Sequence, residues 1–315
     1  MAGSYAKIDY RVRPAKSIER KMLVESFRAL KEFGALEHYR YVGLGSVYFS
    51  DFALVHRALG VEKMISIENA TDLSVQARFR LNVPYGNVEM KFGTSTAILQ
   101  RLEWSQRTIC WLDYDGALVK SCLDDVEYIA RNAQSGSVII ASFNAGNIGG
   151  GESDEKPLSA LKTAVGADSV PVDVESKHLS GWGVGDVYRR IFCSAIEDAL
   201  LARASTGRAG ARLIYKPLYY FRYADGVKMI TVGGVLVDES QLGVFRSCNF
   251  EQFDFCRTDE GAYLIEAPHL TYAEMRQMDS ERTKHTCRLP LPAADIDKYR
   301  RFYRYFPKFV EAEIS

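Results

Sequence analysis

The feature that most constrains the fold is an alternation of short apolar segments with amphipathic ones in the first half of the chain. Strands are predicted where short apolar runs end in glycine or polar residues, and helices where apolar residues recur every three or four positions. Such βαβ repetition predicts an α/β domain built on a parallel sheet. The predicted strands are 39–44, 63–67, 88–92, 108–112 and 137–142, and the helices between and before them are 17–33, 50–59, 72–81, 96–102 and 124–132.

The pattern changes in the second half. Helices are predicted at 158–165 and 185–204. Segments 212–223 and 227–237 are then both rich in β-branched and aromatic residues, with Asp225-Gly226 between them. An Asp-Gly pair in that place predicts a hairpin, so these two strands are antiparallel. The rest is predicted to hold a strand at 263–266, a helix that starts with a Thr271–Glu274 capping box, and a last helix at 296–306.

Composition indicates an ordinary folded protein. The chain has 40 Lys and Arg against 40 Asp and Glu, and 47% of its 315 residues are hydrophobic. Disorder needs low hydrophobicity and high net charge, and a chain that acts as a polycation on nucleic acid needs a large positive excess. No apolar run approaches the roughly 18 residues of a membrane span, and the polar N-terminus lacks a secretory signal. We expect a cytoplasmic protein with no membrane partner, and nucleic acid is not favoured.

The cysteines and histidines add no cross-link or metal motif. No two cysteines form a CxxC pair, and no two histidines have metal-ligand spacing on one helix face. This usage predicts reduced cytosolic thiols.

The candidate site lies at the strand ends, because ligands of open parallel sheets bind outside the carboxyl ends of the strands. Glycines after the first strand allow close backbone approach, and an acid after the second strand is placed for ribose hydroxyls. Each residue also has a plainer interpretation: a tight turn, a helix-capping aspartate or a solvated acid. The candidates are Gly43, Gly45, Ser46, Glu68, Asn69, Gly93, Thr94, Ser95, Asp113, Asp115 and Asn144.

This order resembles the class I S-adenosylmethionine (SAM)-dependent methyltransferases over roughly residues 38–237. Residues 41–46 (YVGLGS) look like the first motif of that family, and 65–68 (ISIE) look like its second, with Glu68 in the ribose-binding place. The turn at 91–95 looks like the adenine side, although Thr94 stands where an acid is common, and 111–115 (WLDYD) looks like the substrate-facing fourth motif. The resemblance implies a Rossmann-like, mostly parallel seven-stranded sheet with an antiparallel C-terminal hairpin and helical additions at both ends.

It also implies SAM as cofactor, and methyl transfer to an oxygen, or less favourably a nitrogen, of an unidentified acceptor. The predicted cofactor-binding residues are Gly43, Gly45, Ser46, Glu68, Asn69, Gly93, Thr94, Ser95 and Asp113. Asp113 and Asp115 are the predicted catalytic residues, because a carboxylate there could deprotonate or orient an acceptor hydroxyl.

A metal is left open. The cation-dependent O-methyltransferases of that family place an aspartate at the equivalent of Asp113 and an Asp-Asn pair after the fifth strand, where this chain has Phe143-Asn144. One ligand is therefore missing, so a Mg²⁺ site is not predicted, and Asn144 is better explained as a loop-forming residue.

Three further features have two interpretations each. Lys16 and Arg20, in the basic segment before the first strand, could meet an anionic group in the cleft or simply start a solvated helix. Trp182 could cover a substrate or be partly buried. Aromatic residues from Tyr299 to Phe306 recur at helical spacing, which favours a packing stripe over nucleic-acid stacking.

We predict a helical extension at 1–37, the methyltransferase-type domain at 38–240, and a C-terminal extension at 241–315 packed on it. Two alternatives stay open. The first is a catalytically degenerate protein of the same fold that binds a nucleotide or serves as a partner subunit. The second is an NAD(P)-dependent oxidoreductase, which Tyr48 disfavours because it stands where GxGxxG requires its third glycine.

Overall fold

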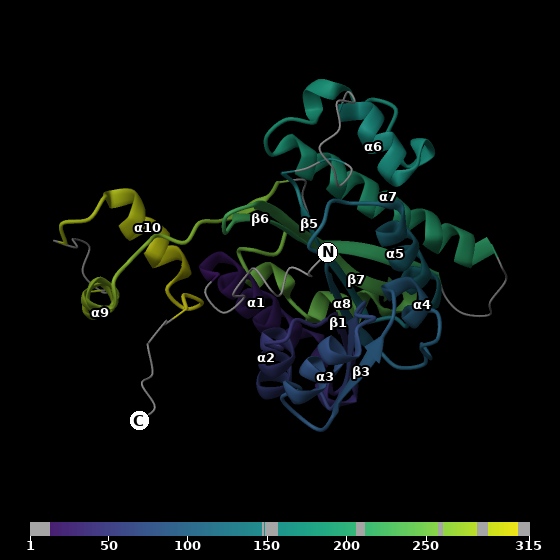
Figure 1. Cartoon of the computed structure of the whole chain (residues 1–315), viewed down its shortest axis with the longest axis horizontal. Helices are drawn as coiled ribbons and strands as arrows, with labels where there is room; N and C mark the ends of the chain where they lie inside the picture. Colours follow the sequence, from purple (N-terminus) through teal and green to yellow (C-terminus); the bar gives the residue numbers. More distant parts are fainter. Residues whose placement is uncertain are drawn as a thin grey trace.

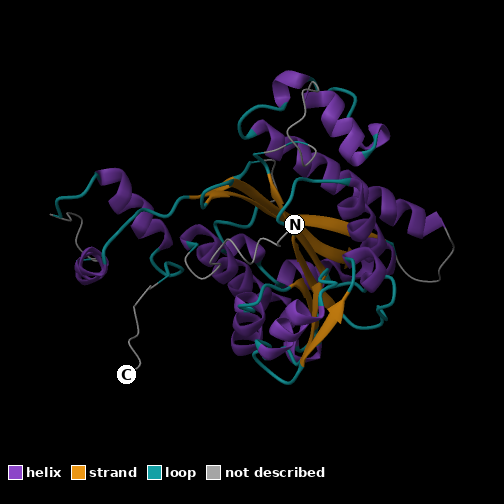
Figure 2. Ribbon diagram, in the orientation of Figure 1, coloured by secondary structure: helices purple, strands orange, loops and turns teal. Residues whose placement is uncertain are grey.

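The computed structural model describes residues 13–146, 148, 157–205, 212–257, 261–281 and 289–307. Within them, eight strands form one sheet in the order β3-β2-β1-β4-β5-β7-β6-β8 (Figures 1 and 2). The strands are β1 (Arg40–Leu44), β2 (Lys63–Glu68), β3 (Val88–Phe92), β4 (Thr108–Asp113), β5 (Val138–Asn144), β6 (Leu213–Ala224), β7 (Lys228–Asp238) and β8 (Tyr263–Ile265).

The sheet has the predicted α/β class and topology. Strands β1 to β5 are parallel to one another, β7 pairs antiparallel with both β5 and β6, and β8 pairs parallel with β6. The eighth strand extends the seven-stranded sheet implied by the resemblance. The strand order reverses between β1 and β4, so their carboxyl ends flank the crevice where open sheets bind ligands.

Helices cover both faces of the sheet. Apolar residues of α1, α2 and α3 share one core with the first face, whereas those of α4, α5, α6 and α7 share a second core with the other face. The helices are α1 (Pro14–Phe27), α2 (Ser50–Leu59), α3 (Leu73–Leu81), α4 (Ser95–Leu99), α5 (Lys120–Asn132), α6 (Pro157–Val165), α7 (Gly183–Ser205), α8 (Leu242–Ser247), α9 (Tyr272–Ser280) and α10 (Ala293–Phe302).

The predicted start of the first helix is wrong. Helix α1 begins at Pro14 rather than after Ser17, so residues 14–16 form its first turn. The carboxylate of Asp225, in the β6–β7 turn, accepts hydrogen bonds from the backbone N–H groups of Ala15 (3.2 Å) and Lys16 (2.9 Å). This long-range cap replaces the local one, and proline suits the first position of a helix.

The C-terminal helices α9 and α10 lie beyond β6, at the left of Figure 1. The capping box of α9 is confirmed, because Thr271 and Glu274 bond each other's backbone N–H. The aromatic stripe is confirmed as packing: Tyr299, Phe302 and Phe306 are buried. The domain division at residues 37 and 240 stays a prediction. Within the described residues, no helix has the length and apolar character needed to cross a membrane.

Candidate active site

A cavity of about 590 Å³ opens at the carboxyl edge of the sheet. Nearly all residues predicted from the strand ends line it together: Gly45, Ser46, Glu68, Asn69, Gly93, Thr94, Ser95, Asp113 and Asp115. Gly43 is not in its wall. A Cβ at Gly43 would lie 3.2 Å from the ring of Tyr41, so this glycine serves packing inside β1.

The turn after β1 is tight for a local reason. A Cβ on Gly45 would lie 2.1 Å from the hydroxyl oxygen of Ser66 on the neighbouring strand β2. The turn ends at Phe49, which has a left-handed backbone (φ 46°) and is fully buried against Phe52 and Phe79. Strand packing therefore favours glycine at position 45 whether or not a ligand approaches the turn.

Glu68 faces the cavity from the end of β2. Its partial burial and the charge of Asp115 raise its pKa to about 7, although the backbone N–H of Asn69 opposes the shift. At neutral pH this carboxyl is therefore divided between its charged and neutral forms. A ligand hydroxyl would find either an acceptor or a donor there.

Two residues that line the cavity are held by a buried aspartate that the sequence analysis missed. Asp125 of α5 is fully buried and accepts hydrogen bonds from Thr96 Oγ1 (2.5 Å) and Tyr114 Oη (2.7 Å), both of which line the cavity. Thr94 caps α4 through the backbone N–H of Ala97. The sequence did contain a signal for Asp125, because this acid lies among Cys122, Leu123 and Val126 on the face of α5 that is buried.

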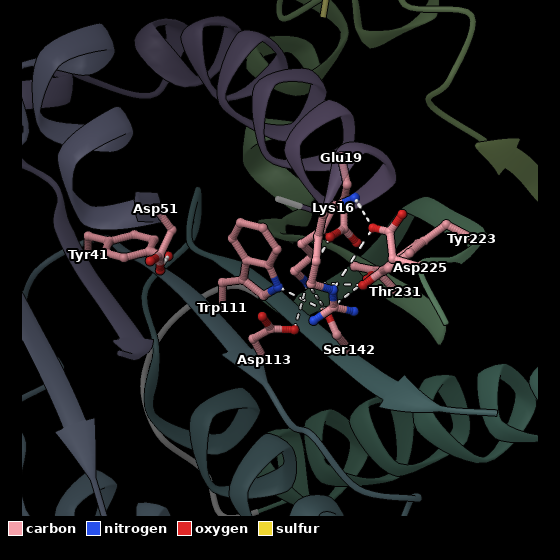
Figure 3. Close-up of polar contacts among 11 residues, drawn as sticks. Lys16, Glu19, Tyr41, Asp51, Trp111, Asp113, Ser142, Tyr223, Asp225 and Thr231 are labelled. Atoms are coloured by element: carbon pink, nitrogen blue, oxygen red, sulfur yellow. Dashed lines mark hydrogen bonds and ion pairs between the residues drawn. The ribbon is translucent and has the colours of Figure 1, made fainter. Parts of the chain in front are cut away.

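Asp113, at the end of β4, meets a buried lysine from α1. Lys16 Nζ lies 2.6 Å from Asp113 Oδ1 and 2.7 Å from Glu19 Oε2, and it also donates to Tyr223 Oη at 3.0 Å (Figure 3). The Lys16 side chain is 1% exposed. Its interpretation as part of a solvated helix start is therefore wrong, and it contacts chain carboxylates instead of lining the cavity.

Arg20, one turn further along α1, does line the cavity, together with Asp51 of α2. Tyr41 Oη donates a hydrogen bond to Asp51 Oδ2 (2.7 Å). Burial raises the pKa of Asp51, and the charge of Arg20 opposes that shift. Of the two predicted cations, Arg20 is thus the one that a ligand in the cavity can reach.

Two other candidates lie outside the cavity wall. Asn144 Oδ1 accepts from the backbone N–H of Gly146 (2.8 Å), which confirms the loop-forming interpretation. Trp182 is half-buried and its ring lies beneath the cationic groups of Arg222 and Lys228. No group of three or more potential His, Cys, Asp or Glu metal ligands occurs in the part of the chain that the structure describes.

The sequence model of one protein family, described as "Putative O-methyltransferase", matches residues 8–314. The chain belongs to this family. The methyltransferase predicted from the strand ends is thereby confirmed at the level of the family, and the oxidoreductase alternative loses its support.

Solved structures of similar architecture are distant from this chain. The O-methyltransferase from Bacillus cereus in complex with SAH is 15% identical, with 73% of this chain and 85% of that chain covered and a TM-score of 0.38. Trm1 from Pyrococcus horikoshii with S-adenosyl-L-methionine is 13% identical, with 72% and 56% covered and a TM-score of 0.44. No curated protein matches the sequence.

Proposed function

We propose that this family member binds SAM in the cavity at the carboxyl edge and transfers its methyl group to an oxygen of an acceptor. The observation that carries the proposal is the convergence of the β1, β2, β3 and β4 ends on one cavity. Its volume, about 590 Å³, falls within the range of small-molecule sites, about 300–1,000 Å³.

The residues present fit this cofactor. Gly45 and Ser46 form a tight turn beside the start of α2, Glu68 offers a half-buried carboxyl for ribose hydroxyls, and residues 93–95 supply a small polar turn. When bound, SAM supplies a methyl group on a positively charged sulfur. Lys16 already balances the charge of Asp113, so a cationic ligand in the cavity would meet the carboxyls of Asp51, Glu68 and Asp115 beside Arg20.

The chain's contribution to methyl transfer is alignment and charge. When bound, the cofactor would supply a methyl group whose bonding electron pair stays on sulfur, so the chain has to orient the acceptor oxygen and receive its proton. Asp113 orients the acceptor by accepting a hydrogen bond. We assign the acceptor's proton to Asp115, because an ion-paired carboxylate such as Asp113 is a poor base.

Calorimetric titration of the full chain with SAM and with SAH tests the proposal. We expect both to bind with micromolar affinity, and we expect that affinity to fall at least tenfold in Glu68→Ala. The control Glu62→Ala removes an exposed glutamate just before the same strand and should bind as the unmodified chain does. Absence of binding at millimolar SAM by the folded protein would overturn the proposal. Binding without turnover across an acceptor screen would instead favour the catalytically degenerate alternative.

A further inference from the structure

Helix α1 places the buried ammonium group of Lys16 next to Asp113 of the cavity wall. Lys16 Nζ has three N–H donors, and its three closest partners are Asp113 Oδ1, Glu19 Oε2 and Tyr223 Oη, at 2.6, 2.7 and 3.0 Å. Its charge also lies 4.7 Å from the ring centre of Trp111. Because the Lys16 side chain is buried and does not line the cavity, it cannot itself bind a ligand there.

A hydrogen-bonded chain of side chains supports this group from three strands. Trp111 Nε1 on β4 donates to Ser142 Oγ on β5 (3.1 Å), and Ser142 Oγ shares a hydrogen bond with Thr231 Oγ1 on β7 (2.7 Å). Lys16 Nζ lies 3.4 Å from the same Ser142 Oγ. All four side chains are buried, so the lysine has little freedom to move away.

We propose that Lys16 is a positioning residue of the methyl-transfer site, which fixes the Asp113 carboxylate in its charged form and in one orientation at the cavity wall. The catalytic meaning of this assignment rests on the proposed function. The placement itself does not, because it follows from contacts within the chain. Asp113 is the member of the buried group that reaches the cavity, with a side chain 26% exposed.

The charge balance divides the two carboxyls that share the lysine. Burial raises the pKa of Glu19, which Lys16 only partly offsets. Burial also acts on Asp113, but there the charges of Lys16, Arg20 and Arg13 outweigh it and lower the pKa. A proton entering this cluster therefore goes to Glu19, and Asp113 keeps its charge.

The remaining charged and titratable neighbours do not reverse this order. Asp51 and the hydroxyl of Tyr41 face the cluster from α2 and β1, and Tyr223 faces it from β6. Burial holds the pKa of Asp51 above its ordinary value, and it holds both tyrosines neutral by raising their pKa. Asp225 binds the start of α1 and fixes where Lys16 enters the cluster.

The assignment has a chemical consequence. A carboxylate held by an ammonium group does not take up a proton near neutral pH, so it acts as a permanent hydrogen-bond acceptor and negative charge. It also has no need of a metal ion at that oxygen, since Lys16 already supplies a cation. An acceptor hydroxyl is therefore oriented by Asp113 and loses its proton elsewhere.

The test follows the ionisation of Asp113 directly, by carboxyl ¹³C NMR of the full chain labelled at aspartate, with the resonance assigned through Asp113→Asn. In the unmodified chain we expect the titration midpoint of Asp113 to lie below the ordinary aspartate value, because Lys16 holds the carboxylate in its charged form. In Lys16→Met its midpoint should rise by at least about one pH unit, the minimum expected for loss of a close opposite charge. Lys16→Arg should restore most of the low midpoint.

Lys31→Met removes an exposed lysine that follows the same helix, and it should leave the Asp113 resonance unchanged. If Lys16→Met does not fold, Lys16→Met combined with Glu19→Gln removes the buried pair together and gives the same measurement. An Asp113 midpoint that is unchanged without Lys16 would overturn the inference. That result is independent of SAM binding, so it cannot be confused with failure of the proposed function.

Discussion

Substitution of Gly45 by alanine should destabilise the protein through one contact. The added Cβ would lie 2.1 Å from Ser66 Oγ, 3.3 Å from the ring of Phe49 and 3.4 Å from Ser66 Cβ. The first distance is far inside van der Waals contact, whereas the other two need shifts of a few tenths of an ångström at most. Ser66 is fully buried, so its hydroxyl must be displaced within a packed core.

Overpacking of this kind costs about 1–3 kcal/mol of unfolding free energy. The Ser66 hydroxyl has no hydrogen-bond partner among the described residues. Ser66→Ala should therefore be neutral or slightly stabilising by itself. Because it removes the clashing atom, Gly45→Ala combined with Ser66→Ala should recover most of the lost stability. The coupling free energy between the two sites should be about 1–2 kcal/mol, well above the small deviation from additivity that independent sites show.

Urea unfolding of the four proteins in this cycle, followed by circular dichroism, measures the coupling. Calorimetry with SAM on the same proteins then separates stability from binding. If Gly45→Ala costs as much in the Ser66→Ala background as in the unmodified chain, the steric account is refuted. Recovery of stability without recovery of SAM binding would show that the cofactor also needs the space at Gly45.

Two other predictions concern α1 and Glu68. Asp225→Ala should lower the unfolding free energy by about 0.5–2 kcal/mol, which is the usual cost of a lost helix cap. Asp225→Asn should lower it by less, because the amide oxygen can still accept the hydrogen bonds. Urea unfolding measures both variants, and equal stability of all three proteins would contradict the capping role. Burial raises the folded-state pKa of Glu68 to about 7, above its ordinary value of 4.5, so its contribution to stability is full below about pH 4.5 and is lost as pH rises through 7. The melting temperature of Glu68→Gln should therefore rise relative to the unmodified chain between pH 5 and pH 8, with Glu62→Gln as the exposed control, and a pH-independent difference would contradict the raised pKa.

Periodicity predicted most of the sheet because most side chains of β1, β2, β4 and β5 are buried and the strands are bounded by turn residues. Strand β3 and helix α2 occur at their predicted limits, and the antiparallel hairpin follows Asp225-Gly226 as expected. The start of α1 could not be predicted in the same way. Its cap is a carboxylate 209 positions further along the chain, so no local pattern records it.

The site residues also fall into two groups: those that local sequence predicts and those that depend on tertiary contacts. Residues that follow a strand could be predicted, because parallel strands bring their carboxyl ends to one edge whatever else the chain does. Asp125 and Lys16 lie on helices whose other residues are apolar or charged in ordinary ways, and their roles depend on which side chains the tertiary fold brings to them. The sequence analysis also placed Gly43 among the cofactor-binding residues. In the structure, the position where a Cβ would stand on Gly43 faces Tyr41 and Asp51 inside the protein.

The buried charges explain why α1 belongs with the site as well as with the fold. A lysine and two carboxylates removed from water are costly unless each is paired, and replacement by apolar residues is often neutral or stabilising. The pair Lys16–Glu19 alone would leave no net charge and no contact with the cavity. Adding Asp113 gives the group one carboxylate at the cavity wall, and that carboxylate has the lowered pKa. This arrangement is what a site needs if it must present a carboxylate of fixed orientation as a hydrogen-bond acceptor for an acceptor hydroxyl, and packing alone does not require it.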